Sequence, residues 1–275
     1  MDLVTITCLK DYRQMLQQAE SIRKFVNPCT HWVVVNETQE TFYKNQSLWK
    51  NHLSDFYSNH DLRVIFPEFN GPKCDPIEPY SYNRQQVLKF WISKHINDDY
   101  LILDTKNFFI KNCSIDDWNQ VYGSGLMQSY YEFGGKWIQT TETYARFLGQ
   151  NILEKGYFIV TPFVFRKKTL EKLGDIEKFC VTWIDLHAQK NILFSEFMFY
   201  SYLEREKFEN FNEDDRNVTI WAESTPKITD LFDLIDDKKI LSTGIHKDVY
   251  TKLTDEDKII VTDFLKKLDL VNYLV

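Results

Sequence analysis

The chain has 275 residues, of which 43% are hydrophobic and 16% aromatic, so it can bury a large core. Charged residues make up 27%, and no apolar run approaches the roughly 20 residues that span a bilayer, which argues against a disordered or membrane-spanning protein. The net charge of −7 argues against a general nucleic-acid-binding protein, although a locally basic pocket for an anionic ligand is compatible with it.

The N-terminus and the cysteines indicate a compartment. Residues 1–14 lack the basic start and long apolar stretch of a signal peptide and are typical of a first strand. The five cysteines are scattered, odd in number and form no CxxC pair, which favours reduced thiols over disulfides or a zinc site. We therefore expect a cytoplasmic protein.

The first half of the chain alternates between strand and helix patterns. Short apolar runs predict strands, and apolar residues three or four apart predict helices. The strands are expected at 3–8, 31–36, 62–67, 100–103 and 108–110, the last of which could also continue the one before it. The helices are expected at 12–26, 38–60 and 83–96, with a proline-rich loop over 68–82. This β-α-β order predicts a mainly parallel sheet with crossover helices.

The second half continues in the same manner, without an internal repeat or a linker. Further strands are expected at 157–165, 218–224 and 238–246, and further helices at 167–180 and 195–208. Residues 253–274 predict a C-terminal helix that begins with a capping box, because Thr254 precedes Asp257 by three positions. We expect one α/β domain over residues 1–275.

One stretch, YLILDTKNFFIKN at residues 100–112, interrupts an apolar segment with Asp104-Thr105-Lys106-Asn107. Burying an unpaired carboxylate or ammonium costs several kcal/mol, so the charges either emerge into solvent as a polar turn or have a use. Polar clusters also end two other strands, at Thr7 to Asp11 and at Asn36-Glu37. Ligands of open α/β sheets bind beyond such carboxyl ends.

Glycine-rich phosphate-binding loops are not part of this prediction. The sequence has neither GxGxxG nor GxxxxGK[ST], and it holds nine glycines in all. A phosphate would therefore meet side chains or a metal.

Three segments carry a resemblance to a known fold family: TITCLKDYRQMLQQAESIRKF (5–25), HWVVVNE (31–37) and YNRQQVLKFWISKHINDDYLILDTKNFFIKN (82–112). They resemble GT-A-fold glycosyltransferases, and more narrowly an uncharacterised bacterial and phage family of glycosyltransferase-like proteins. In that family an R-Q-Q-x-x-K helix precedes a strand that ends in a D-x-D metal motif. Here the helix pattern is Arg84, Gln85, Gln86 and Lys89, and Asp104-Thr105-Lys106 stands at the D-x-D position.

The resemblance implies a GT-A-like α/β fold with a mixed, mainly parallel sheet. Residues 1–112 would form the nucleotide-sugar-binding half, and 113–275 the acceptor-side half with its C-terminal helix. The implied reaction is of the hexosyltransferase type, from a nucleotide diphosphate sugar to a hydroxyl acceptor, with a glycan as the expected acceptor. The sequence does not distinguish retention from inversion, and it does not name the base or the sugar.

The chain departs from the motif where the metal would bind. Two carboxylates normally hold a divalent cation that bridges the donor phosphates, but Lys106 replaces the second one. In the favoured interpretation Lys106 supplies the positive charge and transfer is metal-independent. In the other, Mn²⁺ or Mg²⁺ binds through Asp104, Asn107 and a late residue such as His246.

The resemblance also implies substrate contacts, at Thr7, Lys10, Asp11, Asn36, Arg84, Gln85, Lys89, Asp104, Asn107, His246 and Lys247. The first three would surround the nucleoside, and Asn36 or Glu37 would touch the base or ribose. Lys89, His246 and Lys247 would lie around the diphosphate. Each position also has a structural interpretation, since exposed helical lysines are usually only solvated and lone histidines are usually structural.

The acceptor side has two candidate bases. Ser195 predicts a helix N-cap, which would place Glu196 in the first turn and already accounts for its charge. Flanking phenylalanines could also raise the pKa of Glu196, as a general base requires, and Asp185 is its rival. With Lys106, these are the predicted catalytic residues. A sugar-stacking wall is expected among Tyr80, Tyr82, Tyr130, Tyr131 and Trp137.

Two other functions fit parts of the sequence. The incomplete D-x-D motif suits a non-catalytic nucleotide-sugar-binding or glycan-binding protein on the same scaffold. A nucleotidyltransferase would share the sheet, but its glycine-rich N-terminal loop has no counterpart in TITCLKDYRQ.

Overall fold

The computed structural model describes residues 1–57, 59–68, 80–118, 128–129, 135–153, 155–156, 161–204, 216–221 and 227–274. Its centre is a five-stranded sheet in the order β3-β2-β1-β4-β8. The bounds are β1 Asp2–Thr7, β2 Thr30–Val35, β3 Asp61–Ile65, β4 Tyr100–Asp104 and β8 Phe163–Phe165. The first four strands are parallel and β8 pairs antiparallel with β4, so the predicted mixed, mainly parallel sheet is confirmed.

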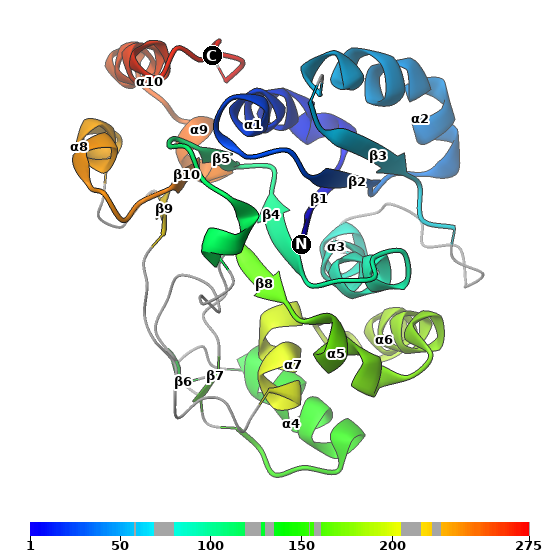
Figure 1. The fold of residues 1–275 in the computed structure, drawn as a ribbon. Helices are drawn as coiled ribbons and strands as arrows, with labels where there is room; N and C mark the ends of the chain where they lie inside the picture. Colours follow the sequence, from blue (N-terminus) through cyan, green and yellow to red (C-terminus); the bar gives the residue numbers. More distant parts are fainter. Residues whose placement is uncertain are drawn as a thin grey trace.

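Helices cover both faces of this sheet (Figure 1). On one face lie α1 (Tyr12–Phe25) and α2 (Gln39–Lys44), and on the other α3 (Tyr80–Trp91) and α6 (Ile176–Lys190). Because side chains alternate along a strand, Leu3 of β1 packs with the α1 side whereas Val4 packs with the α3 side. The result is two hydrophobic cores separated by one sheet.

A second, three-stranded sheet lies beside the end of β4, in the order β5-β10-β9. Its strands are β5 Asn107–Phe109, β9 Asn217–Ile220 and β10 Ser242–Ile245. It has its own core, to which α8 (Leu231–Asp236) and α10 (Asp255–Lys267) contribute. Residues after the turn at 105–106 therefore form a separate strand and do not continue β4.

The remaining elements are short or were not expected. The pattern over 38–60 breaks into α2, a π-helical turn at Leu48–His52 and a 3₁₀ turn at Leu53–Phe56. The other helices are α4 Gly135–Leu148, α5 Lys167–Leu170, α7 Glu196–Leu203 and α9 Lys247–Tyr250. Within the described residues, the other 3₁₀ turns are Leu9–Asp11, Ile92–Lys94, Ile115–Trp118, Glu171–Leu173 and Ile228–Asp230. The strands β6 Gln128–Ser129 and β7 Lys155–Gly156 form a two-stranded pair.

The C-terminal helix begins as predicted. Thr254 accepts a hydrogen bond from the Asp257 backbone, and the Asp257 carboxylate accepts one from the Thr254 backbone, which completes the capping box. The helix ends at Lys267, earlier than expected. Among the described residues, no helix is both long enough and apolar enough to cross a membrane.

Candidate active site

The predicted polar clusters meet at the carboxyl edge of the central sheet. β1 lies between β2 and β4, so the chain order reverses there, as at the ligand-binding crevice of open α/β sheets. Asp104 pairs in register with Ile6, and the Asn36 backbone donates to the Thr7 carbonyl. Glu37 also accepts a hydrogen bond from the Leu9 backbone.

Asn107 holds the turn that follows β4. Its Oδ1 accepts from the Asp104 backbone at 2.9 Å and from Thr161 Oγ1 at 2.7 Å, and its Nδ2 donates to the Thr161 carbonyl at 3.1 Å. The side chain is 1% exposed. The amide of Asn107 is therefore engaged by the protein itself, and its contact with a substrate stays a prediction.

Gly244 of β10 lets this turn approach closely. A Cβ atom at that position would lie 3.1 Å from Asn107 Nδ2 and 3.2 Å from the Lys106 carbonyl, tighter than ordinary van der Waals contact. Gly244 pairs in register with Asn107 across the small sheet. The glycine thus allows β10 to carry the following residue, Ile245, and then His246 toward Lys106.

Two lysines form ion pairs with the carboxylate of Asp104. Lys89 Nζ lies 3.1 Å from Oδ1, and Lys106 Nζ forms an ion pair with Oδ2. Burial alone would raise the pKa of Asp104, but the two ammonium groups outweigh it and hold the pKa far below its usual range. Asp104 is therefore ionised at neutral pH, and its negative charge faces the two ammonium groups.

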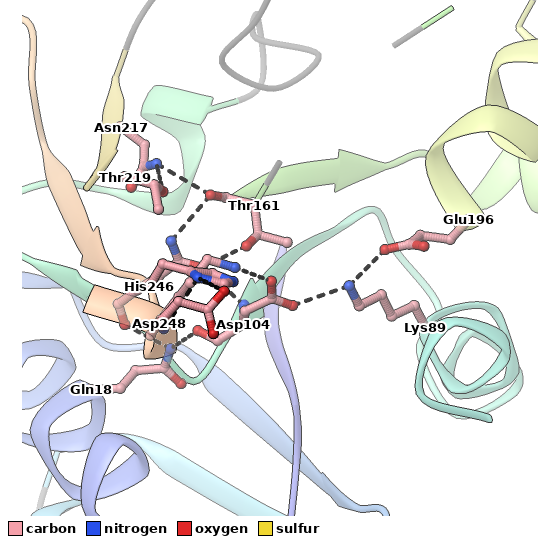
Figure 2. Close-up of polar contacts among 11 residues, drawn as sticks. Gln18, Lys89, Asp104, Thr161, Glu196, Asn217, Thr219, His246 and Asp248 are labelled. Carbon is pink, nitrogen blue, oxygen red and sulfur yellow. Dashed lines mark hydrogen bonds and ion pairs between the residues drawn. The ribbon is translucent and has the colours of Figure 1, made fainter. Parts of the chain in front are cut away.

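Lys89 bridges Asp104 to Glu196 inside the protein (Figure 2). Its Nζ lies 2.6 Å from Glu196 Oε1, and the lysine is 2% exposed. Burial would lower the pKa of Lys89, but the carboxylates of Asp104 and Glu196 raise it above its usual value. Lys89 thus forms a buried bridge, and its contact with a donor phosphate stays a prediction.

Glu196 lies in the first turn of α7, and Ser195 caps that helix by accepting from the Met198 backbone, as predicted. Burial raises the pKa of Glu196 even though Lys89 opposes the shift. Among described residues its Oε2 has no hydrogen-bond partner, and the side chain is 1% exposed. This position is closed to an acceptor in the present arrangement, so catalytic use of Glu196 stays a prediction.

His246 directly follows β10 and is drawn near the turn in Figure 2. Its ring stacks on Trp221, with centroids 4.2 Å apart and planes at 27°. Its Nδ1 lies 3.4 Å from Asp248 Oδ2, and Lys106 Nζ lies 5.8 Å from the Trp221 centroid. Trp221, which follows β9, was missed by the sequence reasoning, although a tryptophan at a strand end beside a polar site is the signal that would have found it.

The other predicted residues have different contacts and degrees of burial. Arg84 donates to the backbone carbonyls of Glu37 and Pro67, so it ties together the segments that follow β2 and β3. Asp11 accepts a hydrogen bond from Cys8 Sγ. Asp185 is half-buried on α6 and, within the described part of the chain, forms no hydrogen bond or ion pair with the cluster. The remaining predicted residues are Thr7, which is buried, Lys10, which is exposed, and Asn36 and Gln85, which are half-buried.

The aromatic wall is described only in part. Tyr82 is 42% exposed, whereas Trp137 packs against the hydrophobic core and does not form a free wall. Tyr130 and Tyr131 lie outside the described residues, as do the side chains of Tyr80 and Lys247.

A divalent cation does not fit the donor atoms in this arrangement. Both Asp104 oxygens accept from ammonium groups, and Asn107 Oδ1 already accepts two hydrogen bonds. Within the described ranges, no three His, Cys, Asp or Glu side chains converge on one metal position. Asp104, Asn107 and His246 therefore do not form a ligand set here.

Solved structures with a similar fold are glycosyltransferases. The WbbM bifunctional glycosyltransferase superposes with a TM-score of 0.52 at 12% identity, over 89% of this chain and 45% of that one. The galactosyltransferase LgtC superposes with a TM-score of 0.47 at 12% identity, over 98% of this chain and 97% of that one. GlyE of Streptococcus pneumoniae superposes with a TM-score of 0.48 at 12% identity, over 99% of this chain and 60% of that one. The chain thus spans less than half of WbbM, and this likeness shows a shared GT-A-like fold.

No curated protein matches the sequence. The pattern of one family, DUF6492, matches residues 10–233, which include Lys89, Asp104, Lys106 and Glu196 but not His246. The chain belongs to DUF6492, a family of unknown function.

Proposed function

We propose that the protein is a glycosyltransferase that moves a sugar from a nucleotide diphosphate sugar to a hydroxyl acceptor. The observation that carries this proposal is the Asp104–Lys106 ion pair at the carboxyl end of β4. It stands at the reversal point of the sheet, where such folds hold nucleotides, and it places a cation where the diphosphate would lie. The glycosyltransferase fold of the similar structures supports the same conclusion.

Lys106 is the residue that would neutralise the departing diphosphate. Its side chain is 14% exposed, whereas that of Lys89 is 2% exposed, so Lys106 is the lysine of this pair that a donor can reach. An ammonium group that donates to phosphate oxygens stabilises the negative charge that grows as the glycosidic bond breaks. Lys106 would supply this charge in place of the metal of a D-x-D motif.

The neighbouring residues take supporting parts in this proposal. Asp104 orients Lys106 through their ion pair, and His246, which stacks on Trp221, offers a second polar group. The nucleoside would lie over Lys10 and Asp11, where the segment after β1 meets Asn36. Glu196 acts as the counter-charge of Lys89, while Asp185 and Glu196 remain the candidates for the acceptor-side base.

A second function is favoured by one observation. Both oxygens of Asp104 are already engaged by lysines, which also suits a protein that binds a nucleotide sugar or glycan without transferring it. The two functions differ in whether the glycosidic bond of the donor is broken.

Calorimetry with UDP, GDP, CDP and their sugars tests the donor site, with each ligand titrated once with Mn²⁺ and once with a chelator. We expect one nucleotide to bind in both conditions, because Lys106 supplies the charge. Release of the sugar from that donor, by transfer or by hydrolysis, then separates a transferase from a binding protein. If no nucleotide binds in either condition, the assignment of the donor site is wrong and only the fold stands.

A further inference from the structure

A buried glutamine lies directly beneath the turn that carries Asp104 and Lys106. Gln18 of α1 is 0% exposed, and its Nε2 donates to the backbone carbonyls of Asp104 and Asn107, both at 2.8 Å (Figure 2). One amide group therefore holds the first and the last residue of the four-residue turn. The sequence reasoning used α1 only for its apolar face and missed this contact.

The orientation of this amide is fixed by a chain of hydrogen bonds. Thr5 Oγ1 donates to Gln18 Oε1 at 2.7 Å, so the single hydroxyl proton of Thr5 is used. The 2.9 Å contact between Thr5 Oγ1 and His31 Nε2 must then have the imidazole as donor. His31 Nδ1 is left as an acceptor, and Tyr57 donates to it at 2.6 Å.

Each donor in this series of hydrogen bonds meets an acceptor within the series only if His31 is neutral. Burial lowers the pKa of His31 to about 3, in agreement with that assignment. The direction of every bond follows from Tyr57 through His31 and Thr5 to Gln18. A half-turn of the Gln18 amide would place its Oε1 against the carbonyl oxygens of Asp104 and Asn107, so these two acceptors oppose the rotation.

We propose that Gln18 is a positioning residue, which fixes the turn at 104–107 so that Lys106 stands where the donor diphosphate is neutralised. This inference rests on the proposed function. Without Gln18, two carbonyls beneath the turn lose a buried donor, and such groups cost free energy unless the backbone moves to find another. The end of β5 has an independent support, because Ser21 Oγ accepts from the Phe109 backbone at 3.0 Å. Movement would therefore be confined to the turn.

The test compares Gln18→Leu and Gln18→Glu with Gln17→Leu. Gln17 is the preceding residue of the same helix and is 1% exposed, but its Oε1 accepts from the Tyr273 backbone, away from the turn. The Gln18→Glu variant keeps the size of the side chain and removes both donors. Each variant is measured by amide hydrogen exchange of residues 100–110, by thermal unfolding, and by kcat and donor KM.

We expect both Gln18 variants to speed exchange at 104–107 and to lower kcat by about 10- to 100-fold, since a shift of about 1 Å in a catalytic group has that effect. Donor KM should change less than kcat, and Gln17→Leu should leave exchange and kcat near wild type. Equal losses in Gln17→Leu and Gln18→Leu, or unchanged exchange at 104–107, would overturn the proposal.

A second pair of variants covers the case in which the Gln18 variants do not fold. Thr5→Val keeps the shape of the side chain but removes the donor that orients Gln18, whereas Thr5→Ser keeps the hydroxyl group. We expect faster exchange at 104–107 in Thr5→Val and recovery in Thr5→Ser. If wild-type protein transfers no sugar, the proposed function fails, while the exchange measurements still decide whether Gln18 holds the turn.

Discussion

Lys89 and Glu196 are 107 positions apart in the sequence, yet Lys89 Nζ lies 2.6 Å from Glu196 Oε1 inside the protein. The same ammonium group also lies 3.1 Å from Asp104 Oδ1. One buried cation therefore joins α3, the end of β4 and the start of α7. This bridge makes the geometry around Asp104 depend on the packing of two helices.

A double-mutant cycle at Lys89 and Glu196 measures this coupling. Removing one partner of a buried pair costs about 3–5 kcal/mol, because the other charge stays buried without compensation. We expect Lys89→Met, which leaves Glu196 without its cation, to lower the free energy of unfolding by about that amount in urea titrations. Glu196→Met should lower it by less, because Lys89 keeps Asp104 as a partner. The double variant should lose clearly less than the sum of the two, and strict additivity would contradict the coupling.

Lys106→Ala should separate activity from stability. The Lys106 side chain is 14% exposed, and Asp104 keeps Lys89 as a partner, so we expect a change of only a few degrees in Tm. Turnover should fall by about 10²- to 10³-fold, as when one stabilising group is removed from a transition-state charge. Kinetics and thermal unfolding check the two effects.

Lys24→Ala is the matched control for that experiment, because Lys24 also pairs with an aspartate, Asp269, but away from the site. It should leave turnover unchanged. If Lys106→Ala turned over at the wild-type rate, Lys106 would not be the group that neutralises the diphosphate.

Lys106→Asp introduces the second acid of the D-x-D motif. It should replace the ammonium group of Lys106 with a divalent metal ion as the cation at the diphosphate. Two carboxylates at this turn would provide oxygen ligands for a divalent metal. We expect nucleotide binding by this variant to require Mn²⁺ and to vanish in chelator, whereas wild-type binding persists in both. Calorimetry distinguishes them, and a wild-type protein that loses binding in chelator would reverse the assignment.

The stability of the protein should depend on His31 in mildly acidic solution. Burial lowers its pKa to about 3 in the folded state, against about 6.5 in the unfolded chain. Between these values the unfolded state binds a proton that the folded state does not, so stability falls as the pH is lowered from about 6.5 toward 3. The contribution is at most about 1.4 kcal/mol per pH unit.

Comparing His31→Gln with wild type between pH 4.5 and 7 isolates this effect, because both proteins share every carboxylate that titrates in the range. The buried Glu196, whose pKa is raised, contributes with the opposite sign in both. We expect the free energy of unfolding of the variant to vary less steeply with pH. Parallel pH profiles would show that His31 does not titrate on unfolding.

Local patterns in the sequence are sufficient to predict much of the central sheet. The apolar runs at β1, β2 and β4 and the periodicity of α1 depend on neighbouring residues alone, so they can be read in order. The same is true of the capping box at Thr254. The position of Asp104 beside the end of β1 followed from the rule that parallel strands share a carboxyl edge.

Pairings between distant residues were not predictable in this way. Nothing near Asn107 in the sequence indicates that β5 pairs with β10, or that Lys89 would be buried against Glu196. Helix α4 was missed although its sequence is amphipathic, because its apolar positions are interspersed with polar residues in a stretch interpreted as irregular. Asn107 and Lys89 were assigned to the substrate because their partners within the protein, Thr161 and Glu196, lie far along the chain.

The small sheet β5-β10-β9 also has a consequence for the order of folding. Phe109 of β5 pairs with Ser242 of β10, 133 positions later, whereas the registers of β1 with β2 and with β4 join residues 28 and 98 positions apart. β10 then delivers His246 beside Trp221. Pairings of such long range form slowly, because the entropy of closing the loop is lost before the contacts are gained. The parallel strands β1, β2 and β4 can assemble earlier from nearer contacts. During synthesis the scaffold would therefore precede the site, and ligand binding would appear only when the last third of the chain has joined it.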